Sequence, residues 1–161
     1  MYLLGLDVGT SSIKASILNA VTGECTATAS SPETEMEIIA PKAGWAEQDP
    51  ELWWKHTRLA IAAALWKAMI NPEEIDAIGI SYQMHGLVCV DKDFKVLRNA
   101  IIWCDSRAVD YGNTAFKEIG PEKCLSHLLN SPGNFTASKL KWVKENEPEI
   151  YAKAKHVLLP K

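Results

Sequence analysis

The sequence predicts an α/β domain, a mixed β-sheet with helices packed on it. Three short extended segments open the chain, and helical and extended segments then alternate to the end of its 161 residues. Hydrophobic residues make up 47% of the chain and charged residues 23%, which is typical of a chain that folds around a sizeable core. This composition argues against a disordered protein.

The start of the chain is expected to form three strands. Tyr2–Val8 is a short apolar run, and apolar and polar residues alternate over 13–19 and again over 25–29. The turns between these segments are short, which is typical of antiparallel neighbours. The pattern therefore predicts a β-meander.

A long helix is expected to begin at Pro50, after a loop over 31–49. Asp49 is a good N-cap, and proline is preferred at the first helical position. Asn71-Pro72 ends the helix, because a residue before proline disfavours helical backbone. Apolar positions recur at steps of three and four along one face, which is expected to cover the sheet: Leu52, His56, Leu59, Ala63, Trp66 and Ile70.

The rest of the chain mixes short strands and helices. Strands are expected over 75–81, 87–90, 95–97 and 100–103, and helices over 109–119, from Thr136 or Ser138 onward, and over 148–155. The apolar run 157–159 predicts one more strand. Because a domain seldom ends by starting a core strand, the chain is expected to be a fragment of a larger domain.

Several classes of protein do not fit the composition. A net charge of −3 gives no basic surface for nucleic acid. The longest apolar stretch is far shorter than the ~20 residues of a membrane span, and no basic segment precedes Asp7, so no secretory signal is expected. The cysteines form no Cys-x-x-Cys pair and no zinc-finger spacing with histidine. Cys25, Cys89 and Cys124 are expected to be buried free thiols, which favours a cytoplasmic location.

The turn after the first strand has the composition of a phosphate-binding loop. Glycine lets the backbone approach a ligand closely, and the N–H and hydroxyl groups that follow can donate to phosphate oxygens. Asp7 fits as an anchor for a water-bound Mg²⁺, because that ion takes one or two carboxylates and keeps its waters. An ordinary hairpin turn is the alternative, since no Walker loop is present. The candidate phosphate-binding residues are Gly9, Thr10, Ser11, Ser12 and Lys14.

A second loop, Ser81-Tyr82-Gln83-Met84-His85-Gly86, follows a strand end, where α/β proteins tend to place sites. Gln83 and His85 can both donate and accept hydrogen bonds, as a polyhydroxylated ligand requires. Met84 and Trp103 offer apolar surface for the C–H face of a sugar, with Asp105 and Arg107 beside the tryptophan. A turn with a satisfied histidine is the alternative interpretation.

Taken in order, these segments resemble the N-terminal part of the FGGY carbohydrate kinases. The resemblance rests on the Asp-x-Gly-Thr hairpin, Gly44-Trp45-Ala46-Glu47-Gln48-Asp49-Pro50, Gln83-Met84-His85-Gly86 and Ile101-Ile102-Trp103-Cys104-Asp105-Ser106-Arg107. It runs over essentially the whole chain. The hairpin alone is shared with the wider actin, Hsp70 and hexokinase superfamily, whereas the Gln-Met-His-Gly loop is similar to that of the xylulokinases.

The resemblance implies a ribonuclease-H-like fold with a mixed sheet flanked by helices. It implies two such domains closing over ATP and Mg²⁺, with D-xylulose held mainly by the first. It makes Asp7 the acid near Mg²⁺ (through water), with Gly9, Thr10 and Ser11 around the γ-phosphate. Met84, His85 and Trp103 would contact the sugar, with Asp105 and Arg107 near the cleft.

The resemblance also implies that residues 1–161 are an incomplete N-terminal domain. Family members are several times longer, and their catalytic base and adenosine pocket correspond to chain beyond residue 161. The fragment alone is therefore expected to be inactive, and a homodimer is expected only for a full-length enzyme.

One departure affects the substrate. Tyr82 stands where many xylulokinases have a small residue, and it could reshape the sugar pocket. A kinase for another ketose or polyol, or a non-catalytic sugar-binding module derived from such a kinase, therefore stays open. A chaperone or actin-like ATPase using only the hairpin is disfavoured by the second loop.

Overall fold

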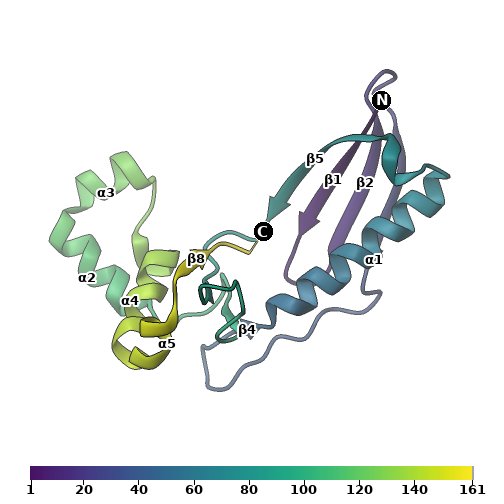
Figure 1. Cartoon of the computed structure of the whole chain (residues 1–161). Helices are drawn as coiled ribbons and strands as arrows, with labels where there is room; N and C mark the ends of the chain where they lie inside the picture. The colour runs from purple at the N-terminus through teal and green to yellow at the C-terminus, as the bar shows by residue number, and fades with distance from the viewer. Residues whose placement is uncertain (161) are drawn as a thin grey trace. The chain divides into compact units, whose positions relative to one another are not determined.

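The computed structural model describes residues 1–160, which form two compact units (Figure 1). Unit 1 comprises residues 1–37 and 51–83, and unit 2 comprises residues 38–50 and 84–160. The chain thus leaves unit 1, returns to it through the long helix, and leaves it again after Gln83.

Unit 1 is a four-stranded mixed sheet with the strand order β3-β2-β1-β5. Strands β1 (Tyr2–Val8), β2 (Ile13–Asn19) and β3 (Cys25–Ser31) are antiparallel neighbours, which confirms the predicted meander. Strand β5 (Ile75–Tyr82) pairs with β1 in parallel, so the carboxyl ends of β1 and β5 lie at the same edge of the sheet.

Helix α1 (Pro50–Ala68) connects the meander to β5 and lies along one face of the sheet, and a short 3-10 turn, η1 (Pro72–Glu74), follows it (Figure 1). The predicted buried face is wrong within the helix, although Ile70, just beyond the end of the helix, is buried as predicted. Leu59 and Trp66 are 49% and 81% exposed. The buried positions are shifted by one residue along the helix: Trp53, Thr57, Ala60 and Ala64.

The size of the side chains accounts for the shift in the middle of the helix, whereas Trp53, near its start, is both large and buried. Helix α1 carries apolar residues around most of its circumference, so several faces satisfy the same spacing. Ala60 and Ala64 are fully buried, and their small side chains let the helix approach the sheet. Bulky Trp54 and Trp66 point outward and are 57% and 81% exposed.

Unit 2 combines two small sheets with four helices. Strand β4 (Glu47–Gln48) pairs with β7 (Ala100–Ile101), and β6 (Val88–Val90) pairs with β8 (His156–Leu158), both antiparallel. The helices are α2 (Val109–Ile119), α3 (Pro121–Leu128), α4 (Thr136–Asn146) and α5 (Pro148–Lys153), with a 3-10 turn, η2 (Pro132–Asn134), before α4. Its buried core comprises Leu87, Cys89, Ile101, Ala108, Trp142 and Val143.

Helix α3 was not predicted. Gly120-Pro121 reads as a stop signal for α2, but Pro121 is also the first residue of α3, the helical position that proline prefers. The predicted strand over 95–97 is reduced to a single bridge between Val96 and Val90.

The cysteines follow the prediction in part. All four are free, and Cys89 and Cys124 are buried as predicted. The prediction for Cys25 is wrong, because its side chain is exposed at the start of the edge strand β3.

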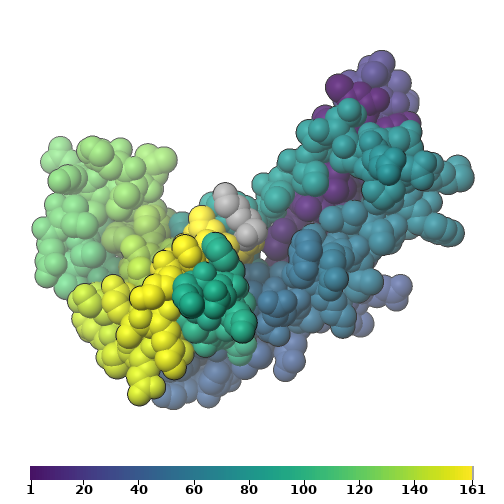
Figure 2. Space-filling view, in the orientation of Figure 1, coloured from purple at the N-terminus to yellow at the C-terminus, as the bar shows by residue number. Residues whose placement is uncertain are grey.

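Apolar side chains remain on the surface of unit 1. Helix α1 and strand β5 both reach the surface on the face drawn in Figure 2, in blue and teal. On β5, Ile78 and Ile80 expose 59% and 51% of their surface. Over residues 1–160, no helix is long and apolar enough to cross a membrane.

Candidate functional site

The turn between β1 and β2 carries the predicted phosphate-binding residues. The register pairs Asp7 with Lys14, whose Nζ lies 3.9 Å from the Asp7 carboxylate, and about half of each side chain is exposed. A Cβ at Gly9 would lie 2.8 Å from the carbonyl oxygen of Ser12, so only glycine lets the turn close without a shift. The hairpin therefore presents one exposed carboxylate and one amine at the end of the sheet.

The end of β5 is bonded to this hairpin. The Gln83 backbone N–H donates to the Val8 carbonyl at 3.0 Å, and the Thr10 hydroxyl donates to Gln83 Oε1 at 3.3 Å. The side-chain nitrogen of Gln83 is buried and has no hydrogen-bond partner among the residues described. A buried donor of this kind would be satisfied by an oxygen of a ligand.

The donor set of the hairpin suits Mg²⁺ held through water better than a metal cage. Residues 1–160 contain no group of three or more His, Cys, Asp and Glu side chains that could hold a metal ion. Asp7 offers a single, half-exposed carboxylate. A hydrated Mg²⁺ needs no more than one or two carboxylates, because water and substrate phosphates supply its other ligands.

The second loop is tightly held within unit 2. His85 has a φ of 62°, which is uncommon for a residue other than glycine, and its ring stacks on Phe135 at 4.7 Å. A Cβ at Gly86 would lie 2.2 Å from Cγ of Pro160, so glycine is required at this close approach. The Gly86 carbonyl accepts a hydrogen bond from the Thr136 hydroxyl at 3.1 Å. Helix α4 and the end of the described chain thus fix this loop from two sides.

The electrostatic surroundings of His85 favour a neutral ring. Burial lowers the pKa of His85, and the positive charge of Lys139 lowers it further. A neutral imidazole has one donor and one acceptor nitrogen, which matches the two-way hydrogen bonding of a sugar hydroxyl. Met84 and Trp103 are 66% and 50% exposed, so both can offer apolar surface.

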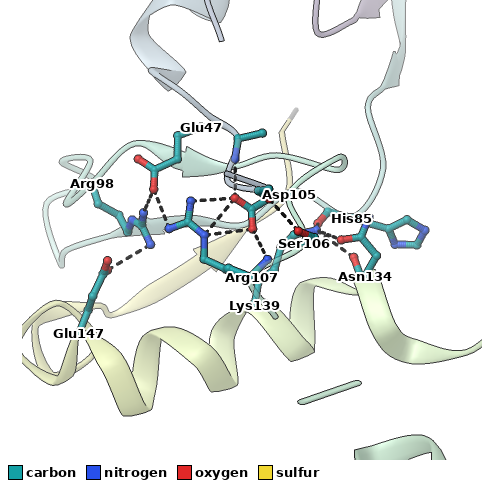
Figure 3. A network of polar contacts seen from close by, with 11 residues as sticks. Glu47, His85, Arg98, Asp105, Ser106, Arg107, Asn134, Lys139 and Glu147 are labelled. Atoms are coloured by element: carbon teal, nitrogen blue, oxygen red, sulfur yellow. Dashed lines mark hydrogen bonds and ion pairs between the residues drawn. The ribbon is translucent and has the colours of Figure 1, made fainter. Parts of the chain in front are cut away.

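Asp105 and Arg107 lie in a buried ion network (Figure 3). Asp105 is 1% exposed and accepts hydrogen bonds from the backbone N–H groups of Ala46 at 2.6 Å and Arg107 at 2.9 Å. The Arg107 guanidinium pairs with Asp105 and with Glu47, each at 2.7 Å. These contacts join the segment before α1 to the segment after β7.

The same network continues away from the loop. Arg98 pairs with Glu47 and, at 3.1 Å, with Glu147 (Figure 3). Arg107 also lies over the ring of Trp45 at 3.8 Å, and Trp45 packs edge-on against Trp142 at 5.3 Å. The network and these two rings therefore brace unit 2.

Some of the predicted site residues belong to unit 1 and the others belong to unit 2. The hairpin residues and Gln83 belong to unit 1: Asp7, Gly9, Thr10, Ser11, Ser12, Lys14 and Gln83. The other predicted sugar contacts belong to unit 2: Met84, His85, Trp103, Asp105 and Arg107. Gln83 and Met84 are consecutive, so the chain passes from one set to the other within a single loop.

Sequence reasoning missed several residues that contact these segments, among them Phe135, Lys139 and Asn134. Lys139 is fully buried on α4 and donates to the His85 carbonyl at 2.7 Å. Its position, three and four residues before Trp142 and Val143, puts a lysine on the apolar face of the predicted helix. That pattern was a usable signal, whereas nothing in the sequence marks Asn134 within its loop.

Known proteins resemble this chain over nearly its whole length. The N-terminal domain model of the FGGY family of carbohydrate kinases matches residues 2–161. The chain is 38% identical to the xylulose kinase of Bacillus subtilis over 99% of the chain and 31% of that protein.

Solved structures show the same partial coverage. A crystal structure of a xyloylose kinase from Brucella ovis matches with a TM-score of 0.87 at 36% identity, over 100% of this chain and 33% of that one. A gluconate kinase from Lactobacillus acidophilus matches with a TM-score of 0.83 at 27% identity, over 99% of this chain and 31% of that one. The chain therefore spans about a third of the length of the relatives it matches.

Proposed function

Since the chain belongs to the FGGY family of carbohydrate kinases, we propose that it forms the N-terminal part of an ATP-dependent xylulokinase. The reaction would transfer the γ-phosphate of ATP to D-xylulose and give D-xylulose 5-phosphate. The likeness to xylulose kinases supports the substrate, because one of them is 38% identical across nearly the whole chain.

One observation carries the proposal. The hydrogen bonds from Gln83 to Val8 and from Thr10 to Gln83 join the Asp-x-Gly-Thr hairpin to the start of the Gln-Met-His-Gly loop. Phosphoryl transfer requires that the phosphate donor and the acceptor hydroxyl be held next to each other. Both hydrogen bonds lie within unit 1, and they hold Gln83, one of the residues proposed to contact the sugar, against the hairpin proposed to hold the phosphates.

The hairpin would hold the phosphates. The N–H groups of Thr10, Ser11 and Ser12 and the hydroxyls of Ser11 and Ser12 would donate to phosphate oxygens, and Lys14 would add a positive charge. Asp7 would hold Mg²⁺ through water. Magnesium supplies positive charge that offsets the charge on the transferring group.

The second loop would hold the sugar. His85, as a neutral imidazole, would exchange hydrogen bonds with sugar hydroxyls, and the unpartnered Gln83 amide nitrogen would donate to another oxygen. Met84 and Trp103 would contact the C–H face of the sugar. The buried contacts of Asp105 and Arg107 support a role in holding the Trp103 segment in place beside the sugar.

The remaining groups of the reaction would come from chain that follows residue 161. These are the aspartate that accepts the proton of the attacking hydroxyl, the rest of the first domain and the second domain with its adenosine pocket. The coverage of about a third of each relative supports this division. Residues 1–161 alone would bind substrate without turning it over.

A second candidate is a kinase of the same family for another ketose or polyol. The likeness to a gluconate kinase favours it, since that structure matches 99% of the chain with a TM-score of 0.83. Tyr82 at the end of β5 would be the residue that reshapes the pocket.

A substrate panel tests the proposal and its rival together. The complete gene product is assayed with MgATP and D-xylulose, D-ribulose, L-ribulose, glycerol or gluconate, and ADP release is coupled to a spectroscopic signal. We expect the highest kcat/KM for D-xylulose. A higher kcat/KM for glycerol or gluconate would overturn the substrate assignment. Independently of that outcome, Tyr82→Gly should shift the order of preference among the ketoses without abolishing turnover.

A further inference from the structure

Lys139 is a buried lysine that the proposed reaction does not use. Its side chain is fully buried on α4, on the same face of the helix as the core residues Trp142 and Val143. Lysine is almost never fully buried unless its charge is partnered. Hydrophobic packing alone therefore does not explain why an ammonium group is buried at this position.

The ammonium group uses all of its donors. Lys139 Nζ donates to the His85 carbonyl at 2.7 Å and to the carbonyl and the side-chain oxygen of Asn134, both at 2.9 Å. A lysine ammonium has three N–H donors, so each is matched by one oxygen. None of these acceptors carries a formal charge. Because they belong to two loops, the ammonium group links the His85 loop to the Asn134 loop (Figure 3).

The connected loops carry the predicted sugar contacts. His85 has a positive φ and stacks on Phe135, and its own carbonyl is the oxygen that Lys139 holds. The side-chain N–H of Asn134 donates to the carbonyl of Trp103. One ammonium group therefore fixes the His85 segment directly and the Trp103 segment through Asn134.

Stability does not explain this arrangement. A methionine or leucine at position 139 would fill similar volume without the cost of removing a charge from water. Four ionisable side chains face the amine, and only one of them is a carboxylate: His85, Cys104, Asp105 and Arg107. A buried charge in such surroundings is better accounted for by the loop geometry that it imposes.

We propose that Lys139 is a positioning residue of the sugar pocket, which holds the His85 and Trp103 segments in their binding geometry through the His85 carbonyl and Asn134. The inference rests on the proposed function, because it assigns the pocket to a sugar. Lys139 does not touch the reacting atoms. Its loss should weaken sugar binding while leaving the phosphate side of the reaction nearly unchanged.

The test compares Lys139→Met with Lys141→Met in the complete gene product. Lys141 lies two residues away on the same helix, half exposed, and pairs with Glu145, so its loss controls for a removed lysine on α4. We expect Lys139→Met to raise the KM for D-xylulose about tenfold or more and to change the KM for MgATP by less than about twofold. Lys141→Met should change neither value by more than about twofold.

A measurement that needs no turnover accompanies the kinetics. The ring resonances of His85 are assigned with His85→Gln and followed against pH by NMR. Removing the charge of Lys139 should raise the pKa of His85, and loosening the loop should shift its resonances away from the values that stacking on Phe135 produces. If Lys139→Met does not fold, Asn134→Ala replaces it and should raise the KM for D-xylulose by releasing the Trp103 segment.

The two measurements separate the inference from the proposed function. Wild-type turnover of D-xylulose with an unchanged KM in folded Lys139→Met overturns the positioning role and leaves the function intact. A wild type that phosphorylates no sugar, together with an altered His85 titration in Lys139→Met, overturns the function and supports the control of His85 by Lys139. An unchanged His85 titration overturns the inference in either case.

Discussion

The hydroxyl of Thr10 and the side-chain oxygen of Gln83 are joined by a hydrogen bond of 3.3 Å, although 73 positions separate them in the sequence. They meet because β1 and β5 are parallel neighbours, so the segments that leave them emerge from the same edge of the sheet. The bond links the loop proposed for phosphates to the loop proposed for the sugar.

Removing this bond should impair catalysis modestly. Thr10→Val keeps the shape of the side chain and removes the hydroxyl, which corresponds to about 0.5–1.5 kcal/mol or up to about tenfold in kcat/KM. Thr10→Ser keeps the hydroxyl and should stay close to wild type. The test is to measure kcat/KM for both variants of the complete gene product. An equal loss of kcat/KM in Thr10→Val and Thr10→Ser would show that the hydrogen bond does not contribute to catalysis.

Asp7 should matter for turnover far more than for sugar binding. Asp7→Asn keeps the size of the side chain but removes the charge that would hold Mg²⁺, so kcat should fall on the order of 10²-fold or more. The KM for D-xylulose should change little, because the sugar contacts lie in the other loop. The exposed acid Glu24 supplies the control, and Glu24→Gln should leave kcat unchanged. Wild-type kcat in Asp7→Asn at saturating MgATP would contradict this role.

Breaking the buried ion network should destabilise unit 2. Arg107→Met removes the guanidinium that pairs with buried Asp105, whereas Glu47 keeps its pair with Arg98, and breaking a buried pair in this way costs about 3–5 kcal/mol. Urea unfolding measures the loss. Arg58→Met removes an exposed arginine that lies over Trp54 and should change the free energy of unfolding by no more than about 0.5 kcal/mol. Similar effects of the two substitutions would contradict the assignment.

Lys139 should give the chain a distinctive pH dependence of stability. Burial lowers the pKa of Lys139 from 10.5 to about 8. Between these values the unfolded chain keeps a proton that the folded chain has released, so the free energy of unfolding rises with pH. The rise amounts to roughly 3 kcal/mol, at about 1.36 kcal/mol for each pKa unit, and Lys139→Met should lack it.

The comparison needs one further substitution. Burial raises the pKa of the neighbouring Cys104 thiol, so that thiol also titrates in alkaline solution. Both proteins therefore carry Cys104→Ser, and urea unfolding is measured from about pH 7 to about pH 10.5, the range that spans the two pKa values of Lys139. Parallel pH profiles with and without Lys139 would show that its amine is not perturbed.

Exposed apolar residues on β5 should make residues 1–161 associate when they are produced alone. Among the described residues β5 is an edge strand, and Ile78 and Ile80 are 59% and 51% exposed on it. Light scattering should show association that Ile78→Lys reduces. Val21→Lys, at an 80% exposed residue in a turn, should have no such effect. A monodisperse monomer before any substitution would contradict this expectation.

Local patterns predicted much of unit 1 and both candidate loops. The alternation over 13–19 and the short turns indicated the meander, and Asp49-Pro50 and Asn71-Pro72 marked the ends of the long helix close to where the structure has them. These features depend on neighbouring residues and backbone sterics, which a sequence displays directly.

Features set by distant contacts were harder to predict. The buried face of α1 depends on how closely Ala60 and Ala64 can approach the sheet, and periodicity alone does not choose between adjacent apolar faces. Lys139 was missed although it lies on the apolar face of a predicted helix, and its acceptors come from two loops that only the folded chain brings to it. The pairing of Arg107 with Glu47 likewise joins segments far apart in the sequence.

The transfer of phosphate to the sugar tests the proposed activity most directly. The complete gene product is incubated with Mg²⁺, D-xylulose and ATP labelled at its γ-phosphate, and the labelled products are separated. We expect labelled D-xylulose 5-phosphate from the wild type and, under the same conditions, on the order of 10²-fold less from Asp7→Asn. Label that appears only as inorganic phosphate, or that reaches glycerol or gluconate in preference to D-xylulose, would contradict the proposed xylulokinase activity.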